Sequence, residues 1–132
     1  MKYLLLVSHA SYAKGMQESL SMLMGPREYL IACGMGEGVS PEEFRGQVTD
    51  ALAELSSEDE IVLLADIGGG SPVRNAILSI ANAGLLAQTR SFGGMNLPMA
   101  ISALMAIDDE LDLDSIAESV LAEGAAAVRA LD

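Results

Sequence analysis

The feature that most constrains the fold is the segment 61–72, IVLLADIGGGSP, where an apolar run leads into a carboxylate, three glycines and a serine–proline pair. Residues 61–65 predict a β-strand that is buried on both faces. Glycines 68–70 permit left-handed or otherwise strained turns that a Cβ would forbid. Ser71 and Pro72 predict a helix start, with serine as N-cap and proline at the first helical position. The segment therefore predicts a strand, a carboxylate, a glycine turn and a helix N-terminus, in that order.

This arrangement predicts an anion site. Free backbone N–H groups at the positive end of a helix dipole suit a phosphoryl group. The carboxylate of Asp66 would repel such an anion unless a cationic group stood between them. His9, the only histidine in the chain, is the candidate for that group.

The rest of the chain alternates strands and helices. Strands are predicted at residues 3–8, 29–33 and 61–65, with a weaker signal at 87–92. Helix starts are predicted at Ser11, Ser40, Ser71 and Pro98, and a last helix carries Ile116, Val120 and Leu121. Four such units with near-continuous apolar strands indicate an α/β fold, a doubly wound and mainly parallel sheet with helices on both faces. The 132 residues suit one domain, 1–132.

The helical spacing of apolar residues also predicts which side chains face the core. The inward positions are Met16, Leu20, Leu23 and Met24 in the first helix, and Ile101, Leu104 and Met105 in the helix that Pro98 opens. After Gly124, residues 125–132 fit either a continuation of the last helix or a short strand.

The unusual polar residues all follow strands. In open α/β sheets, ligands bind beyond the carboxyl ends of the strands, at the point where the strand order reverses. A strand order of 2-1-3-4 puts that point between the first and third strands. Because neighbouring strands lie about 4.8 Å apart, His9 and Asp66 are expected to meet in one crevice.

Such a pair suits phosphoryl transfer through a histidine. A carboxylate that accepts a hydrogen bond from one ring nitrogen fixes the tautomer and leaves the other nitrogen free to attack. The backbone at Gly69 and Gly70 and the hydroxyl of Ser71 would donate to the phosphoryl oxygens. Each feature also has a simpler interpretation: His9 as a polar loop residue, Asp66 as a turn residue and the glycines as a plain tight turn.

Composition argues against several other classes of protein. A net charge of −12 with scattered basic residues argues against nucleic acid as a partner. The single cysteine, Cys33, rules out an internal disulfide and fits a reducing cytoplasm. The apolar runs are shorter than a membrane span and no signal peptide is predicted. We expect no metal and no cofactor, because the chain has no cysteine–histidine cluster for zinc and no P-loop lysine, and the glycines at 34–38 do not fit a dinucleotide fingerprint.

Three motifs together resemble a known family. VSH at 7–9, DIGGGSP at 66–72 and GMNLPM at 94–99 are similar to the mannose-type enzyme IIA of the bacterial phosphoenolpyruvate-dependent sugar phosphotransferase system. The resemblance implies that His9 accepts a phosphoryl group from the phosphocarrier HPr and passes it to a IIB subunit. It also implies that Asp66 hydrogen-bonds this histidine and that Ser71 lies near the phosphoryl group.

The resemblance carries further expectations. Family members are doubly wound homodimers that exchange a C-terminal antiparallel edge strand, which would fall after Gly124. The chain would be cytoplasmic, would associate peripherally with the membrane IIC and IID subunits, and would need a separate IIB partner. Ile67 and Gly68 depart from the family, which often has a hydroxyl and an aromatic residue there. Two alternatives stay open: a phosphotransfer subunit of a dihydroxyacetone kinase system, and a non-catalytic regulatory or flavodoxin-like binding module.

Overall fold

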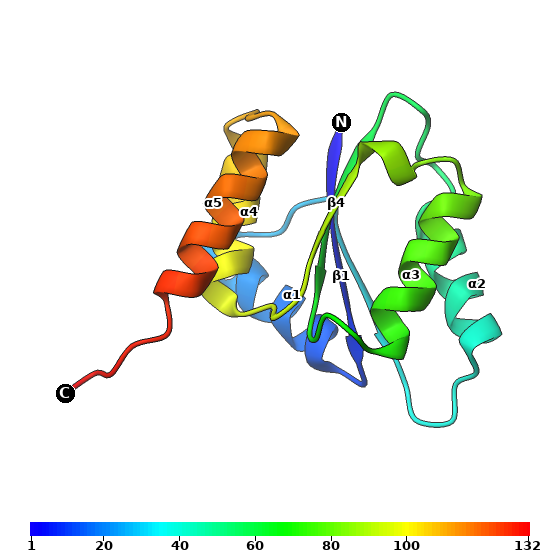
Figure 1. Ribbon diagram of the computed structural model, residues 1–132, viewed down its shortest axis with the longest axis horizontal. Coiled ribbons are helices and arrows are strands. Elements are labelled where there is room, and N and C mark those ends of the chain that lie inside the picture. The colour runs from blue at the N-terminus through cyan, green and yellow to red at the C-terminus, as the bar shows by residue number, and fades with distance from the viewer.

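The computed structural model describes residues 1–132 and consists of a parallel sheet between two layers of helices (Figure 1). The sheet has four strands in the order β2-β1-β3-β4, and all three pairings are parallel. The strands are β1 (Lys2–His9), β2 (Leu30–Met35), β3 (Glu60–Ala65) and β4 (Thr89–Phe92). The predicted fold class and strand order are confirmed.

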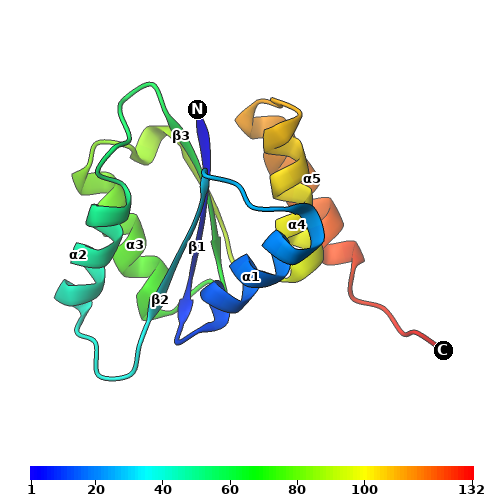
Figure 2. The ribbon, with the colours of Figure 1, turned by 180° about the vertical axis from the view of Figure 1, so that it is seen from behind.

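The helices divide between the two faces of the sheet, as Figures 1 and 2 show from opposite sides. One layer contains α2 (Pro41–Ala51) and α3 (Ser71–Asn82). The other contains α1 (Tyr12–Met24), α4 (Leu97–Asp108) and α5 (Leu113–Ala126). A short 3-10 turn, Leu86–Gln88, precedes β4.

The central strand β1 explains why the fold needs two layers. Its side chains alternate between two hydrophobic clusters: Leu4 and Leu6 pack with α1, α4 and α5, and Leu5 and Val7 pack with α2 and α3. All four are fully buried. Burying each such leucine stabilises the fold by about 1.5–3 kcal/mol, so both faces of the sheet must be covered.

The predicted cap of α2 is confirmed, because Ser40 accepts a hydrogen bond from the Glu43 backbone N–H at 3.1 Å. Helix α4 is capped by Asn96, which was not predicted as a cap and accepts from the Met99 N–H at 2.9 Å. The prediction that Ser71 caps α3 is wrong by one residue. Gly70 is the N-cap, because the Ser71 hydroxyl is engaged with a side chain inside the helix.

Two predicted core positions, Leu23 and Met105, are wrong for one geometric reason, which also leaves Leu121 of the last helix outside the core. Leu23, Met105 and Leu121 are 59%, 50% and 58% exposed. Each lies next to a residue that does face the core side of its helix, and successive helical residues point about 100° apart. In each adjacent pair only one side chain reaches the core, as Leu104 and Val120 do.

Of the two alternatives for residues 125–132, the structure has a short continuation of the last helix, followed by irregular chain. Helix α5 passes Gly124 and ends at Ala126, and residues 127–132 form neither helix nor strand. They extend away from the layers in both views (Figures 1 and 2). No helix combines the length and the apolar character that a membrane crossing requires.

Candidate active site

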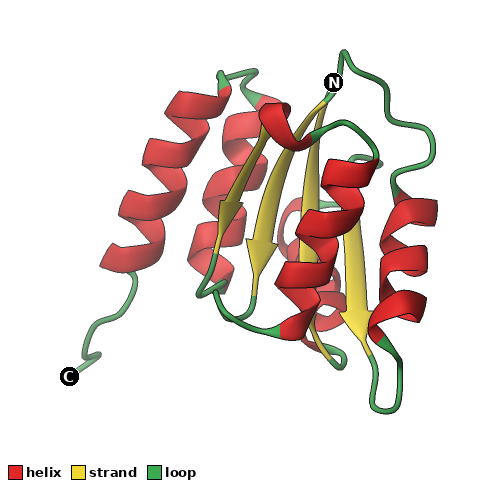
Figure 3. Cartoon of the chain, turned by 45° about the vertical axis from the view of Figure 1, so that its right-hand side comes forward, coloured by secondary structure: helices red, strands yellow, loops and turns green.

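The candidate site lies at the edge of the sheet where the parallel strands end, at the arrowheads in Figure 3. His9 is the last residue of β1, and Asp66 directly follows β3. Because β1 and β3 are neighbours in the sheet, the two residues meet although 57 positions separate them in sequence.

Asp66 is held by three contacts that leave it one orientation. Its Oδ2 atom accepts from the His9 backbone N–H at 2.9 Å and lies 2.8 Å from His9 Nδ1. Its Oδ1 atom accepts from the Ile67 backbone N–H at 2.9 Å. The Asp66 side chain is 14% exposed, whereas that of His9 is 51% exposed. A shielded carboxylate thus orients a solvent-accessible imidazole.

The environment of Asp66 favours its charged form. Burial acts to raise the pKa of this carboxyl, but the hydrogen bonds from His9 and Ile67 outweigh it, and the pKa lies below its ordinary value. A carboxylate only accepts hydrogen bonds, so the proton of a neutral imidazole lies on Nδ1. The lone pair that can attack an electrophile is therefore on Nε2.

Gly70 packs closely against the imidazole of His9 and has no room for a side chain. A Cβ at Gly70 would lie 2.6 Å from His9 Cε1 and 3.2 Å from Nε2, so the ring lies directly against the N-cap of α3. The first-turn N–H groups of a helix have no partners within the helix. His9 Nε2 therefore lies beside a site that favours negative charge.

The expectation that glycines 68–70 adopt left-handed turns is wrong, because none of them has a positive φ. Their small size matters instead. Besides the Gly70 contact, the Gly68 backbone packs on Gly93, where an added Cβ would lie 2.7 Å from Gly68 Cα. The loops after β3 and β4 thus meet backbone to backbone.

Ser71 belongs to a small polar network with Asn75 and Arg45 that was not predicted. Its Oγ accepts from Asn75 Nδ2 at 3.0 Å, and Asn75 Oδ1 accepts from Arg45 Nη1 at 2.6 Å. Asn75 is buried. Because the Ser71 oxygen already accepts, its hydroxyl proton is available to a further acceptor. The i, i+4 spacing of Ser71 and Asn75 was the signal in the sequence.

Gly69 is the least constrained of the predicted site residues. It is exposed, and no atom lies within 4 Å of the Cβ position. Its carbonyl accepts from Arg74 Nη2 at 3.2 Å.

The turn after His9 is tightly specified. Ala10 adopts a positive φ of 49°, and a Cβ at Gly34 would collide with the Ala10 carbonyl oxygen. Ser11 is the N-cap of α1, as predicted, but its side chain makes no cap hydrogen bond. The buried Ser8 Oγ instead accepts from the Ala13 N–H in the first turn of the helix, at 2.7 Å. Ser8 was missed, although a serine inside an apolar strand was a usable signal.

Apolar and aromatic groups border the site. Ile67 is 54% exposed, and its Cδ1 atom would lie 3.3 Å from a Cβ at Gly70. The Tyr12 hydroxyl donates to the Met95 carbonyl at 2.7 Å, joining the start of α1 to the loop after β4. No group of three or more metal-ligating side chains lies together in the molecule.

Comparisons with known proteins agree with this architecture. The model of the EIIA-man family, described as the PTS system fructose IIA component, matches residues 3–121. The solved mannose/sorbose specific IIA subunit of the phosphotransferase system from Enterococcus faecalis superposes with a TM-score of 0.85 at 27% identity, covering 100% of this chain and 96% of that one.

Curated relatives point the same way. The chain is 26% identical over 124 residues to the PTS system mannose-specific EIIAB component of Escherichia coli strain K12, which covers 94% of this chain and 38% of that protein. It is 28% identical over 96 residues to the PTS system fructose-specific EIIA component of Bacillus subtilis strain 168, which covers 73% of this chain and 64% of that protein. The chain thus spans less than two thirds of either relative. Since the family match extends over most of its length, the chain belongs to the EIIA-man family of phosphotransferase-system IIA components.

Proposed function

We propose that this chain is a phosphohistidine carrier for sugar uptake, which accepts a phosphoryl group on His9 Nε2 and passes it on. The observation that carries the proposal is the orientation of one imidazole. Asp66 Oδ2 lies 2.8 Å from Nδ1, and Gly70 at the N-cap of α3 lies against the edge that carries Nε2.

The proposed chemistry needs no further group from the protein to make or break bonds. The lone pair of Nε2 forms a bond to phosphorus as the bond between phosphorus and the donor nitrogen of HPr breaks, and the donor imidazole keeps that electron pair. Asp66 holds the proton on Nδ1 throughout and offsets the positive charge that develops on the ring. Positioning and charge stabilisation then account for most of the catalysis.

The glycine turn and Ser71 receive the phosphoryl oxygens in this proposal. The backbone N–H groups of Gly69, Gly70 and Ser71 lie at the start of α3, where an anion is favoured. The Ser71 hydroxyl proton is a further donor, since Asn75 already occupies an acceptor position of its oxygen.

The proposed partners follow from family membership. HPr donates the phosphoryl group, and a IIB unit outside residues 1–132 accepts it for transfer to a sugar at the membrane IIC and IID subunits. We further propose that the chain works in the cytoplasm as a homodimer and associates peripherally with the transporter. Residues 127–132, which form no helix or strand in the single chain, are the segment for an exchanged edge strand.

Phosphoryl transfer from phosphoenolpyruvate tests the proposal. With enzyme I, HPr and labelled phosphoenolpyruvate, the wild-type chain should acquire an acid-labile, base-stable phosphate, and His9→Ala should acquire none. Ser71→Ala is the companion variant, because it keeps the nucleophile and should still be labelled, at a lower rate. An unlabelled wild type, or equal labelling of His9→Ala, would refute the function.

A further inference from the structure

Arg74, in the first turns of α3, carries a positive charge that no carboxylate of the molecule balances. The chain has 19 acidic and seven basic residues, and most of its arginines form ion pairs. Arg27 pairs with Asp108, Arg45 with Glu42, and Arg90 with Asp114. Arg74 forms no such pair, and the remaining arginine, Arg129, lies in the C-terminal segment after α5.

The guanidinium of Arg74 is held at the edge of the candidate site. Its backbone N–H donates to the Gly70 carbonyl at 3.3 Å, which places Arg74 one helical turn beyond the residue that contacts His9. Helical side chains lean toward the N-terminus of their helix. Accordingly, Arg74 Nη2 returns to the Gly69 carbonyl at 3.2 Å.

Most of the donors on this guanidinium are unused. Arginine has five N–H donors in a planar fork that matches phosphate oxygens. The contact with Gly69 is the only side-chain hydrogen bond that Arg74 makes. An exposed cation with free donors therefore contacts Gly69, the residue before Gly70, and Gly70 packs against the imidazole edge that carries Nε2.

We propose that Arg74 is a catalytic residue that binds the phosphoryl oxygens on His9. The inference rests on the proposed function. A phosphoryl group on Nε2 brings up to two negative charges close to the ionised Asp66. The helix N-terminus offsets part of the repulsion, and the guanidinium of Arg74 offsets more of it through charge-assisted hydrogen bonds.

Two other roles for Arg74 predict different behaviour. A residue that only docks HPr changes the rates of the forward and reverse transfers equally, because the free proteins are unaffected. A residue that only supports the loop acts through its bond to the Gly69 carbonyl. A residue that contacts the phosphoryl group stabilises the free phosphorylated chain and therefore changes the equilibrium constant of transfer.

The experiment measures that equilibrium constant between phosphorylated HPr and this chain. Arg74→Gln keeps an N–H donor for the Gly69 carbonyl but removes the charge, and should shift the equilibrium toward phosphorylated HPr by about tenfold or more. Arg74→Lys should recover part of the shift. Arg90→Gln is the matched control, since Arg90 lies on β4 and pairs with Asp114, and its equilibrium constant should equal that of the wild type.

The outcomes separate the two proposals. If the wild type is phosphorylated on His9 and Arg74→Gln has the wild-type equilibrium constant, the role of Arg74 is refuted while the proposed function stands. A change in rate alone likewise refutes phosphoryl contact and assigns Arg74 to docking or to the loop. If His9 takes up no phosphoryl group, both proposals fail together.

Discussion

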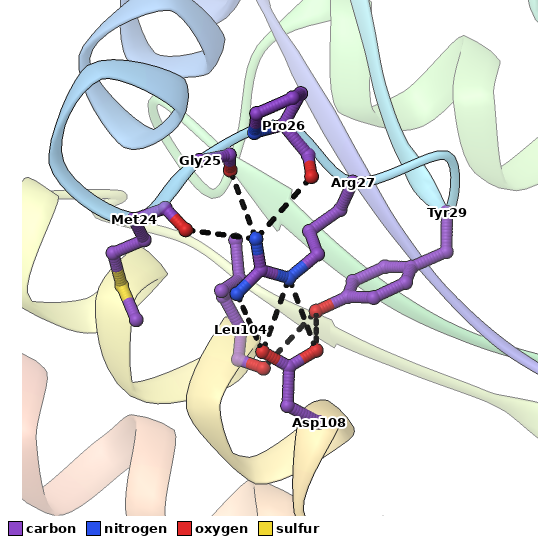
Figure 4. Close-up of polar contacts among 7 residues, drawn as sticks. All are labelled: Met24, Gly25, Pro26, Arg27, Tyr29, Leu104 and Asp108. Atoms are coloured by element: carbon purple, nitrogen blue, oxygen red, sulfur yellow. Dashed lines mark hydrogen bonds and ion pairs between the residues drawn. The ribbon is translucent and has the colours of Figure 1, made fainter.

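Asp66 lies at the edge of the sheet where the strands end, and Asp108 lies at the opposite edge, beside the residues that precede β2. Each of the two carboxylates fixes a neighbouring cationic or polar side chain. Asp108, at the end of α4, binds Arg27 through Nε and Nη2, with a shortest distance of 2.9 Å (Figure 4). The Tyr29 hydroxyl lies 2.6 Å from Asp108 Oδ1 and 3.1 Å from the Leu104 carbonyl. Arg27 Nη1 also donates to the carbonyls of Met24, Gly25 and Pro26.

The two clusters differ in what they leave free. Every nitrogen of the Arg27 guanidinium has a partner, so the cluster joins the segment between α1 and β2 to α4. At the other edge Asp66 is equally well satisfied, but the imidazole that it orients keeps Nε2 unpaired and is half exposed. The same kind of contact therefore serves stability at one edge and, at the other, orients an accessible imidazole, which is the nucleophile of the proposed function.

We expect the largest effect from a substitution that breaks the hydrogen bond between Asp66 and His9. Asp66→Asn puts an amide where the carboxylate receives N–H donors from His9 and Ile67, so the imidazole loses the partner that fixes its tautomer. The equivalent change in a serine-protease triad lowers the rate by about 10⁴-fold, and we expect a loss of about 10²-fold or more here. Rapid-quench phosphorylation by HPr measures it.

Asp108→Asn is the matched control, because it makes the same substitution in the cluster of Arg27, Tyr29 and Asp108 at the opposite edge. Its phosphorylation rate should equal that of the wild type. Equal rates for Asp66→Asn and the wild type would remove Asp66 from the mechanism.

The next effect tests the packing of Gly70 on the imidazole. Gly70→Ala puts a Cβ 2.6 Å from His9 Cε1, so the ring must move away from its position. A misplacement of about 1 Å can lower a rate by about 10²-fold, and for the smaller shift expected here we expect a loss of about tenfold. Gly69→Ala keeps its backbone N–H, meets no atom within 4 Å, and should retain most of the rate. Similar losses in both variants would show that the turn, and not the contact, is responsible.

The fold could be predicted because its signals are local. Near-continuous apolar strands, caps such as Ser40 and the alternation of strands with helices together specify a doubly wound sheet. The neighbourhood of His9 and Asp66 then follows from strand order alone. It is harder to predict which of two adjacent apolar helix residues is buried, since choosing between Leu104 and Met105 requires knowing how the helix is rotated on the sheet.

The finer features of both edges depend on contacts between distant residues. Arg27 and Asp108 are 81 positions apart, and neither residue type signals the other. Gly70 was predicted to serve backbone conformation and to donate its N–H to a phosphoryl group, but its packing on the imidazole depends on where the His9 ring lies. Arg45 and Asn75 come from different helices of one layer, so their bond requires the packing of α2 on α3.

The third prediction separates stability from chemistry. Tyr29→Phe removes the hydroxyl that contacts Asp108 and Leu104 and keeps the ring, so the free energy of unfolding should fall by about 1 kcal/mol. The phosphorylation rate should not change, because Tyr29 precedes β2 at the edge of the sheet remote from His9. Urea denaturation and the HPr assay give the two values. A slowed phosphorylation in a fully folded Tyr29→Phe would show that the two edges are coupled.

The smallest expected effect concerns how the stability contributed by the Arg27–Asp108 ion pair depends on pH. The hydrogen bonds from Arg27 hold the pKa of Asp108 below its ordinary value of 3.8, although burial opposes them. Because the folded pKa is the lower one, the ion pair stabilises the fold fully above the unfolded value, and this contribution is lost as the pH falls through the folded value. Asp108→Asn should therefore be less stable than the wild type at neutral pH, with a difference that shrinks as the pH falls below 3.8. Urea midpoints across that range measure the difference, which is small because a third of the Asp108 side chain is exposed. A difference that stays constant with pH would mean that Asp108 contributes through packing and not through its charge.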